Sequence, residues 1–258
     1  MNSCPDAPCK LELLGITKWF KVDGVPLKAL EDVSLHARAG EFVSLIGPSG
    51  CGKSTLFNII CGLLEPDEGQ VLLDGQVARR RAGLVGYMPQ KDLLLPWRSV
   101  LDNVILGPEL RGEDLQESRR EARELLPLFG LEGFADAYPA VLSGGMKQRA
   151  ALLRTFLTHR EVLLLDEPFG ALDALTRMEL QEWLLGVWAR FQKTILFITH
   201  DVDEAIFLSD RVYVFTPRPG RVRAVLTVPL PRPRRRAMTA SPEFAALRYL
   251  LLEALALR

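Results

Sequence analysis

The spacing of hydrophobic and polar residues changes several times along the chain, and each spacing predicts a different kind of element. Short apolar runs predict strands, and Asp23 and Gly24 mark the turn after the first strand. The predicted strands cover residues 11–17, 33–37, 41–46, 70–73, 83–88, 162–165, 194–198 and 211–215. The predicted helices cover residues 53–64, 146–157, 174–191, 201–208 and 242–257. Because strands alternate with helices, we expect an α/β fold with a largely parallel sheet.

Between residue 90 and about residue 150 the strand pattern disappears. Apolar residues recur there at helical spacing among many charges, at Leu115, Ala122, Leu125, Leu126 and Phe129. Pro127 is expected to kink or shorten this helix. We therefore predict an α-helical subdomain that is inserted into the α/β core.

The segment after residue 216 is rich in proline and arginine and predicts turns and edge strands. We expect the arginine cluster at residues 232–236 to be a solvated linker, because it is short and interrupted by proline. The alternative is a contact with lipid headgroups or nucleic acid. Ser241 and Pro242 form a start signal for the last helix, which we expect to pack on this chain or on a subunit.

The composition is that of an ordinary globular protein, with 25% charged and 48% hydrophobic residues. The 32 basic and 32 acidic residues balance, so no global charge attracts nucleic acid, and we expect no nucleic-acid partner. The N-terminal residues lack a signal-peptide pattern, and no apolar run approaches the ~18 residues that span a bilayer. We expect a cytoplasmic protein that only another chain would hold at a membrane.

Four cysteines are spread along the chain without disulfide or zinc spacing. Cys4 and Cys9 flank a proline-rich start and are interpreted as tail residues. Cys61 lies in an apolar helix, and Cys51 lies in the glycine-rich loop described next. We expect a reduced compartment. We also expect Cys51 to be reactive, because a helix start and Lys53 favour its thiolate.

A glycine-rich loop follows the predicted strand 41–46 and has the form GxxxxGK[ST]. Its residues are Gly47, Pro48, Ser49, Gly50, Cys51, Gly52, Lys53, Ser54 and Thr55. The glycines allow main-chain N–H groups to turn inward, and the start of the next helix favours anions. Lys53 supplies a charge for terminal phosphates, and the Ser54 hydroxyl can bind Mg²⁺. This motif predicts a nucleoside triphosphate site.

Two acids end the predicted buried strand 162–165. A buried carboxylate needs a partner, and Mg²⁺ is the natural partner for Asp166. Glu167 would then lie near the terminal phosphate and polarise an attacking water. The two motifs together predict hydrolysis of Mg-ATP.

The ordered set of motifs resembles the nucleotide-binding subunit of ATP-binding-cassette (ABC) transporters. The set is GPSGCGKST at 47–55, Gln90, LSGGM at 142–146, LLLDEP at 163–168, GALD at 170–173 and His200. The resemblance covers about residues 11–225. It implies an ABC ATPase fold, a P-loop NTPase core with a mixed, largely parallel sheet, an N-terminal antiparallel β subdomain and an inserted helical subdomain.

The resemblance also implies roles for single residues. Phe20 would stack on adenine, with Trp19 as a substitute, and Gln90 would sense Mg²⁺ and the γ-phosphate. His200 would hold the γ-phosphate and the attacking water. Four residues would act across a head-to-tail dimer that sandwiches two ATP molecules: Ser143, Gly144 and Gly145 at the partner's γ-phosphate, and Asp173 at the seam. The start of the helix after Ser143 supports this, because it forms a second anion-binding helix N-terminus.

An apolar stretch at 93–104, with Leu93 to Leu95 before Pro96 and Trp97, predicts a contact with a short helix of an integral membrane permease. A self-packed turn is the alternative. The sequence of this stretch resembles that of ATPases from importers of nitrate, sulfonates, taurine or pyrimidine thiamine precursors. The resemblance implies an importer ATPase on the cytoplasmic face of the plasma membrane, with an extracytoplasmic solute-binding protein. An exporter ATPase and a non-transport ABC ATPase are the alternatives.

We expect four parts in the chain. Residues 1–89 form the first part of the ATP-binding core with the antiparallel β subdomain, and residues 90–158 form the helical subdomain. Residues 159–228 complete the core, and residues 229–258 form the C-terminal tail and helix.

Overall fold

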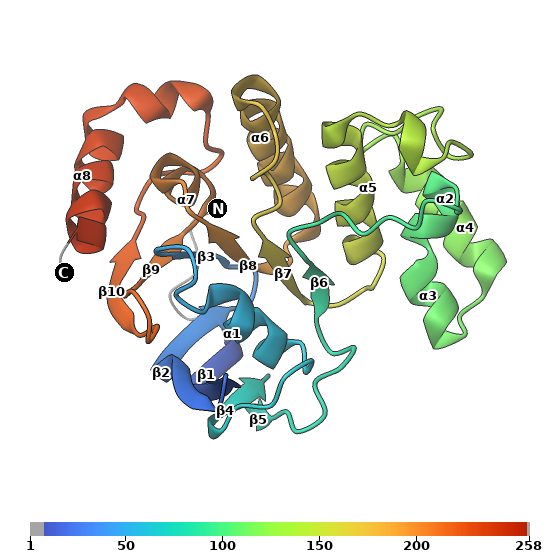
Figure 1. The fold of residues 1–258 in the computed structure, drawn as a ribbon. Helices are drawn as coiled ribbons and strands as arrows, with labels where there is room; N and C mark the ends of the chain where they lie inside the picture. Colours follow the sequence, from blue (N-terminus) through green and yellow to red (C-terminus); the bar gives the residue numbers. More distant parts are fainter. Residues whose placement is uncertain (1–7, 257–258) are drawn as a thin grey trace.

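Six strands form the central sheet of the computed structural model, which describes residues 8–256 (Figure 1). Their order is β10-β9-β3-β8-β7-β6. They are β3 (Phe42–Ile46), β6 (Gly86–Met88), β7 (Val162–Asp166), β8 (Thr194–Thr199), β9 (Arg211–Phe215) and β10 (Val222–Thr227). All neighbours are parallel except β10 and β9, which are antiparallel. This confirms the predicted mixed, largely parallel sheet.

The central strands are short and buried on both faces. In β7, Val162 and Leu164 contact one apolar cluster while Leu163 and Leu165 contact the other. Successive side chains of a strand point to opposite faces, so a continuous apolar run is what a sheet covered on both sides requires. The run at 162–165 therefore indicated the correct element from the sequence alone.

A second sheet is antiparallel and has the order β2-β1-β4-β5. Its strands are β1 (Cys9–Val22), β2 (Val25–Arg38), β4 (Glu68–Leu73) and β5 (Gln76–Val77). β1 and β2 are longer than predicted, since several register shifts in β1 break its alternating pattern. Asp23 and Gly24 make the predicted turn. The interpretation of Cys9 as a tail residue is wrong because Cys9 begins β1, and Cys4 lies outside the described residues.

Helices cover both faces of the central sheet. α1 (Lys53–Ile60) lies between the two sheets in Figure 1, and α6 (Ala174–Phe191) and α7 (Val202–Leu208) cover the other face. α1 ends earlier than predicted, with Gly62 at a φ of 79° just beyond it, and this leaves Leu63 67% exposed. Left-handed glycines of this kind commonly terminate helices.

A group of helices lies beside the sheets, at the right of Figure 1. It contains α2 (Val100–Val104), α3 (Leu106–Arg111), α4 (Leu115–Leu125), the short 3₁₀ helix η1 (Pro139–Val141) and α5 (Gly144–Phe156). α4 ends two residues before Pro127, as expected for a proline that shortens a helix. All of these helices lie within residues 90–158. The four domain boundaries themselves stay a prediction.

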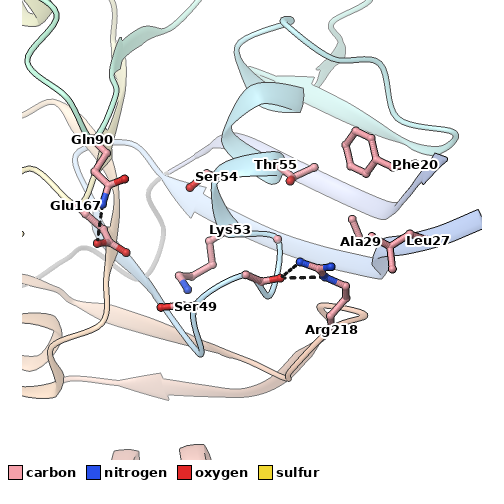
Figure 2. A pocket seen from close by; sticks show the side chains of 12 residues that line it. Phe20, Leu27, Ala29, Ser49, Lys53, Ser54, Thr55, Gln90, Glu167 and Arg218 are labelled. Atoms are coloured by element: carbon pink, nitrogen blue, oxygen red, sulfur yellow. Dashed lines mark hydrogen bonds between the residues drawn. The ribbon is translucent and has the colours of Figure 1, made fainter. Parts of the chain in front are cut away.

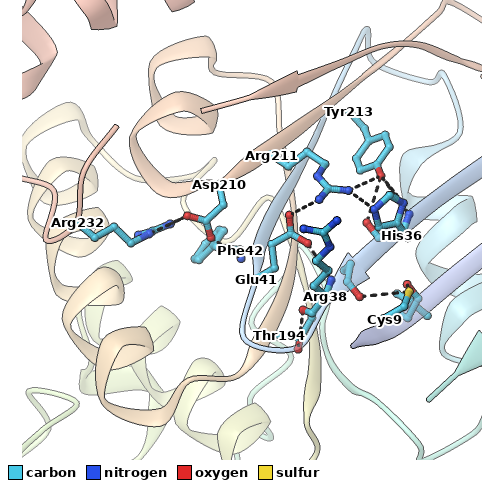
Figure 3. Close-up of polar contacts among 12 residues, drawn as sticks. Cys9, His36, Arg38, Glu41, Phe42, Thr194, Asp210, Arg211, Tyr213 and Arg232 are labelled. Atoms are coloured by element: carbon cyan, nitrogen blue, oxygen red, sulfur yellow. Dashed lines mark hydrogen bonds and ion pairs between the residues drawn. The ribbon is translucent and has the colours of Figure 1, made fainter. Parts of the chain in front are cut away.

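The arginine cluster was wrongly expected to be a solvated linker. Arg232 and Arg234 are 9% and 1% exposed in their side chains, and both lie near Asp210. Arg232 donates to Asp210 Oδ1 at 2.8 Å, while Asp210 Oδ2 accepts from the Phe42 N–H at 3.0 Å (Figure 3). The segment is therefore fixed to the core at the start of β3. Another 3₁₀ helix, η2 (Arg236–Ala240), follows it.

The last helix, α8 (Pro242–Ala256), packs back onto α7. Phe244, Leu247 and Leu251 are buried, and Arg248 forms an ion pair with Asp203 of α7 at 2.5 Å. Of the two partners expected for α8, its own chain or a subunit, the structure shows packing on its own chain. None of the helices in residues 8–256 combines the length and apolar character that crossing a bilayer requires.

Candidate active site

The predicted site residues follow four neighbouring strands of the central sheet. The glycine-rich loop follows β3, His200 follows β8, Asp166 and Glu167 end β7, and Gln90 follows β6. These strands are parallel neighbours in the order β3-β8-β7-β6. Their carboxyl ends share one edge of the sheet, so residues as far apart in the chain as Gly47 and His200 meet there.

The glycine-rich loop has a backbone that only glycine accommodates easily. Gly50 and Gly52 have φ angles of 73° and 107°. A Cβ atom on Gly52 would lie 2.6 Å from Leu30 Cδ2 and 2.9 Å from the Ala29 carbonyl oxygen. The loop therefore packs directly on β2, and α1 starts at once with Lys53. Gly52 has no side chain that could cap the first N–H groups of α1. These N–H groups are therefore available to an anion.

Lys53 is buried to 5% exposure, and its ammonium group lies inside the loop. Nζ donates to the carbonyl oxygens of Gly47 at 2.8 Å and Pro48 at 3.0 Å. A buried ammonium needs such acceptors. These bonds hold the charge of Lys53 at the loop, where terminal phosphates are predicted to lie.

The Cys51 side chain lies behind the loop, in the apolar cluster between the sheets, and is 1% exposed. Its thiol faces Lys53 Nζ at 3.5 Å. A reagent in solution cannot reach a thiol with so little exposed surface, so the expectation of a reactive Cys51 is wrong. Within residues 8–256 all three cysteines are free thiols.

Asp166 ends β7 as a buried carboxyl, 4% exposed. Burial raises its pKa, and a hydrogen bond with the Ser54 side chain acts in the opposite direction. The structure thus brings together Ser54 and Asp166, two of the predicted Mg²⁺ ligands.

Glu167 lies next to Asp166 and contacts the other two predicted catalytic residues. Its Oε2 accepts from Gln90 Nε2 at 3.3 Å and lies 3.2 Å from His200 Nδ1. An ionised carboxylate only accepts hydrogen bonds, so the contact places a proton on His200 Nδ1. The Glu167 N–H donates to the Ile198 carbonyl oxygen at 3.0 Å, which fixes its position relative to β8.

A cavity of about 380 Å³ opens between the loop, β7 and the antiparallel sheet (Figure 2). Its lining residues are Phe20, Leu27, Ala29, Ser49, Gly50, Gly52, Lys53, Ser54, Thr55, Gln90, Glu167 and Arg218. Phe20, Leu27 and Ala29 form an apolar end, and Gln90 and Glu167 form a polar end. This polarity matches a ligand with an aromatic base at one end and phosphates at the other.

Trp19, the alternative to Phe20, does not line this cavity. Lys28 Nζ lies over its ring, 4.4 Å from the ring centroid, and the side chain is otherwise exposed. Phe20 and Trp19 are neighbours in a strand, so their side chains point to opposite faces and only one can face the cavity. The structure thus supports Phe20 over Trp19.

Arg218 and the β2 residues Leu27 and Ala29 line the cavity but were missed from the sequence. Arg218 lies in the turn between β9 and β10, far from every motif along the chain. A proline- and glycine-rich turn gives no signal of what it packs against. Only the neighbouring positions of β9 and β3 in the sheet bring Arg218 to the loop.

The structure does not bring the second glycine motif to this cavity. Ser143, Gly144, Gly145 and Asp173 are absent from its lining. Ser143 caps α5 by accepting from the Met146 N–H at 3.3 Å, and Asp173 caps α6 by accepting from the Thr176 N–H at 3.0 Å. Ser143 and Asp173 are exposed. Within one chain these residues are helix caps.

The donor set fits Mg²⁺ that arrives with a phosphate. Within residues 8–256 no group of three or more histidine, cysteine, aspartate or glutamate residues could hold a metal ion. Mg²⁺ often takes only one or two protein ligands and completes its shell with phosphate oxygens and water. The Ser54 hydroxyl, the Asp166 carboxylate and the Gln90 amide are ligands of this hard, oxygen-based kind.

Comparison with known families gives one match that covers more than half of the chain. The family model described as "ABC transporter" matches residues 30–170. This range contains the glycine-rich loop, Gln90, the second glycine motif and the two acids after β7.

Individual relatives and solved structures are similar along nearly the whole chain. An uncharacterised ABC transporter ATP-binding protein of Methanocaldococcus jannaschii is 47% identical over 95% of this chain and 91% of its own length. The taurine import ATP-binding protein of Rhizobium johnstonii is 46% identical over 87% and 88%. A dimeric post-hydrolysis structure of the ATP-binding cassette MJ0796 with ADP and Pi is 32% identical, covers 84% of this chain and 98% of that one, and has a TM-score of 0.73.

Proposed function

This chain belongs to the ABC transporter family and has the ABC ATPase fold, and from that premise we propose that it is the ATPase subunit of an importer for a small sulfonate such as taurine. One observation carries the ATPase part of the proposal. The phosphate loop, Asp166, Glu167, Gln90 and His200 share one edge of the sheet, and the loop, Gln90 and Glu167 line one cavity there. The importer part rests on similarity to a taurine import protein and on the surface described below.

The cavity residues divide the work of binding. The ring of Phe20 offers a stacking surface for adenine, and Leu27 and Ala29 offer apolar contacts beside it. The loop N–H groups and the start of α1 hold the phosphates, and Lys53 exchanges its carbonyl partners for phosphate oxygens. Ser54, Asp166 and Gln90 would hold Mg²⁺, which supplies charge neutralisation at the phosphates.

Glu167 is the proposed general base. Its carboxylate is held by Gln90 on one side and by His200 on the other, so it stays at the polar end of the cavity. There it can accept a proton from a water that attacks the terminal phosphate. His200, 56% exposed, can orient the same water, and its Nδ1 N–H can turn from Glu167 to the phosphate when a nucleotide is bound. The products are ADP and inorganic phosphate.

The helical group offers the surface for a permease. Leu93, Trp97 and Leu110 are 58%, 71% and 79% exposed, although all three are large and apolar. Leu93 is held at a φ of 46°, an uncommon conformation for leucine, and Arg154 of α5 donates to its carbonyl oxygen at 2.8 Å. An apolar surface fixed in this way is suited to a short apolar helix of a partner. We propose that the permease contact includes residues 93–104, with Leu110 as a further exposed apolar residue of the same helical group.

The ATPase proposal is tested by Glu167→Gln, which keeps the shape of the side chain and removes its basicity. We expect turnover of Mg-ATP to fall about 10²–10⁴-fold while ATP still binds, the range typical of one acid–base group. The measurement is steady-state phosphate release together with calorimetric ATP binding. Glu161→Gln is the matched control, because Glu161 precedes the opposite end of β7 and is exposed. Unchanged turnover in Glu167→Gln would remove Glu167 from the reaction.

The importer proposal needs a transport measurement. Cells that lack this gene should lose uptake of radiolabelled taurine, and the wild-type gene should restore it while Glu167→Gln should not. Nitrate and a pyrimidine serve as competing solutes in the same assay. Normal taurine uptake in the deletion strain would reject the sulfonate assignment and leave the ATPase assignment intact.

A further inference from the structure

The turn between β9 and β10 packs against the phosphate loop. Residues 216–221 form this turn, which is closed by hydrogen bonds between its two ends. The Thr216 N–H donates to the Arg221 carbonyl oxygen at 3.0 Å, and the Arg221 N–H donates to Thr216 Oγ1 at 3.0 Å. Figure 2 shows Arg218 reaching from this turn to the loop.

Arg218 fixes the orientation of one peptide unit of the loop. Its Nε and Nη2 both donate to the Gly50 carbonyl oxygen, at 3.1 and 2.9 Å. In a planar trans peptide the C=O and the following N–H point in opposite directions. Because Arg218 holds the Gly50 oxygen, the Cys51 N–H points away from that contact, where it donates to the Pro48 carbonyl oxygen at 3.3 Å. The Pro48 oxygen also accepts from Lys53 Nζ at 3.0 Å, so Arg218 fixes a peptide unit next to the ammonium group that is expected at the phosphates.

Gly220 brings the same turn against the next peptide unit. A Cβ atom on Gly220 would lie 2.0 Å from the Cys51 carbonyl oxygen, so only glycine allows this approach. The Gly220 N–H donates to the Ala29 carbonyl oxygen at 2.9 Å, and its own oxygen accepts from the Glu31 N–H at 3.0 Å. The turn therefore joins the phosphate loop to β2, which carries Leu27 and Ala29 of the apolar end of the cavity.

We propose that Arg218 is a positioning residue for nucleotide binding, which holds the phosphate loop in the conformation that receives a nucleoside triphosphate. Arg218 also lines the cavity itself, so its charge adds to the attraction for phosphates. The role rests on the proposed ATPase function. It does not extend to the hydrolytic step, because Glu167 takes its side-chain hydrogen bonds from Gln90 and His200 on other strands.

The test compares Arg218→Ala and Arg218→Lys with wild type in the full chain. For Arg218→Ala we expect the calorimetric Kd for Mg-ATP and the KM to rise about tenfold, the effect of losing hydrogen bonds from a charged donor. The kcat at saturating ATP should stay within about twofold. Arg218→Lys should be intermediate, since an ammonium keeps the charge but cannot donate in the two-pronged geometry of a guanidinium. The Tm without nucleotide should not change, because Arg218 is exposed.

Arg221→Ala is the matched control, an arginine of the same turn that pairs with Glu31 on the exposed side. We expect its Kd for ATP to stay within about twofold of wild type. An Arg218→Ala protein with wild-type affinity, or one weakened no more than Arg221→Ala, would overturn the role of Arg218. A lower kcat at unchanged KM would overturn it as well. Wild-type protein that fails to bind ATP would instead reject the proposed function itself.

Discussion

Glu167 combines an uncommon backbone conformation with the central position in the proposed site. Its φ is 44°, a left-handed value that costs a residue other than glycine about 1–2 kcal/mol. The N–H of Glu167 bonds to β8, and its carbonyl oxygen accepts from the Gly170 N–H at 3.1 Å. Strained backbone of this kind is retained where the surrounding structure fixes it, most often at functional sites. Here it turns the chain sharply after β7 and directs the carboxylate to Gln90 and His200.

His36 is a second residue whose chemistry depends on its neighbours. Arg211 donates to His36 Nε2, and the His36 N–H donates to the Tyr213 hydroxyl at 3.1 Å (Figure 3). Arginine keeps its proton, so His36 Nε2 must be the unprotonated acceptor. Burial, and then the charges of Arg211 and Arg38, lower the pKa of His36, with Glu12 acting in the opposite direction.

We predict that His36 makes the protein less stable under mildly acidic conditions. An unfolded histidine takes up a proton near pH 6.5, but the folded His36 resists protonation until a lower pH. Between these two values the unfolded state binds more protons, so stability falls as the pH decreases below about 6.5. The check is the Tm at pH 7.5 and at pH 5.5 for wild type and His36→Gln.

The loss of Tm between these two pH values should be smaller in His36→Gln. Glu41 and Glu204 contribute with the opposite sign, because burial raises the pKa of both carboxyls. Their contribution is present in both proteins and cancels in the comparison. Equal losses of Tm in the two proteins would contradict the prediction.

Single residues differ in how far the sequence could predict them. Lys53, Asp166 and Glu167 belong to local motifs, and local motifs fix both the residue type and the strand end that carries it. Arg218 and His36 lie in no motif, and their partners are more than 160 positions away in the chain. Such pairs depend on which strands become neighbours in the sheet, and spacing along one strand carries no information about that.

Among the elements, the segment before α8 shows how an extended chain attaches a tail to a core. Arg232, Arg234 and Arg236 contact the core, whereas Pro233 and Arg235 between them are exposed. Alternation is the geometry of extended backbone. Arg232 and Arg236 also lie over the rings of Trp188 and Phe207, with guanidinium carbons 4.1 and 4.7 Å from the ring centroids.

We predict that Arg234→Ala destabilises the fold by about 3 kcal/mol, the scale of removing one partner from a buried charge network. Arg234 Nη1 donates to the carbonyl oxygens of Ile206, Phe207 and Ser209 at the end of α7, and these would lose a partner. Burial, followed by the charge of Arg232, lowers the pKa of Arg234 to about 9, which leaves it charged at neutral pH. Thermal unfolding should show a Tm about 6–12 °C lower.

Arg235→Ala is the control for this prediction, because it removes the adjacent arginine at an exposed position. Its stability should stay within about 0.5 kcal/mol of wild type. Equal Tm values for Arg234→Ala and wild type would show that the tail contributes nothing to the core.

The sequence predicted the elements of the core better than those at its edges. β3, β7, β8, β9 and α6 lie close to their predicted positions, because a fully buried strand or a long helix has a strong pattern. β10 is an edge strand, as expected for the segment after residue 216, whereas β5 and the contacts of the tail depend on tertiary structure, and composition misled for the arginine-rich tail. From sequence alone, an arginine-rich segment is predicted to be solvated, because the carbonyl and carboxylate acceptors that surround it in the fold are not known.

In the whole molecule, the two glycine-rich motifs, the phosphate loop and residues 142–146, lie in different places. The phosphate loop lies in the cavity, while Ser143, Gly144 and Asp173 lie exposed at helix starts outside it. A helix start suits an anion, yet these residues do not line the cavity of their own chain. We propose that a second copy of this chain places its nucleotide there; the similar MJ0796 cassette is described as dimeric and bound to ADP and Pi.

This arrangement predicts that Ser143→Arg prevents pairing and leaves the single chain able to bind ATP. In a Glu167→Gln background, where hydrolysis is slow, Mg-ATP should convert the protein from monomer to dimer on light-scattering chromatography. A bulky arginine at residue 143 would occupy the space of the partner's phosphate.

The substitution also removes the cap of α5, worth about 1 kcal/mol. Asp114→Arg is therefore the control, since Asp114 caps α4 at an exposed position away from the cavity. The control should dimerise normally, and a Ser143→Arg protein that dimerises equally well would show that pairing does not use this helix start.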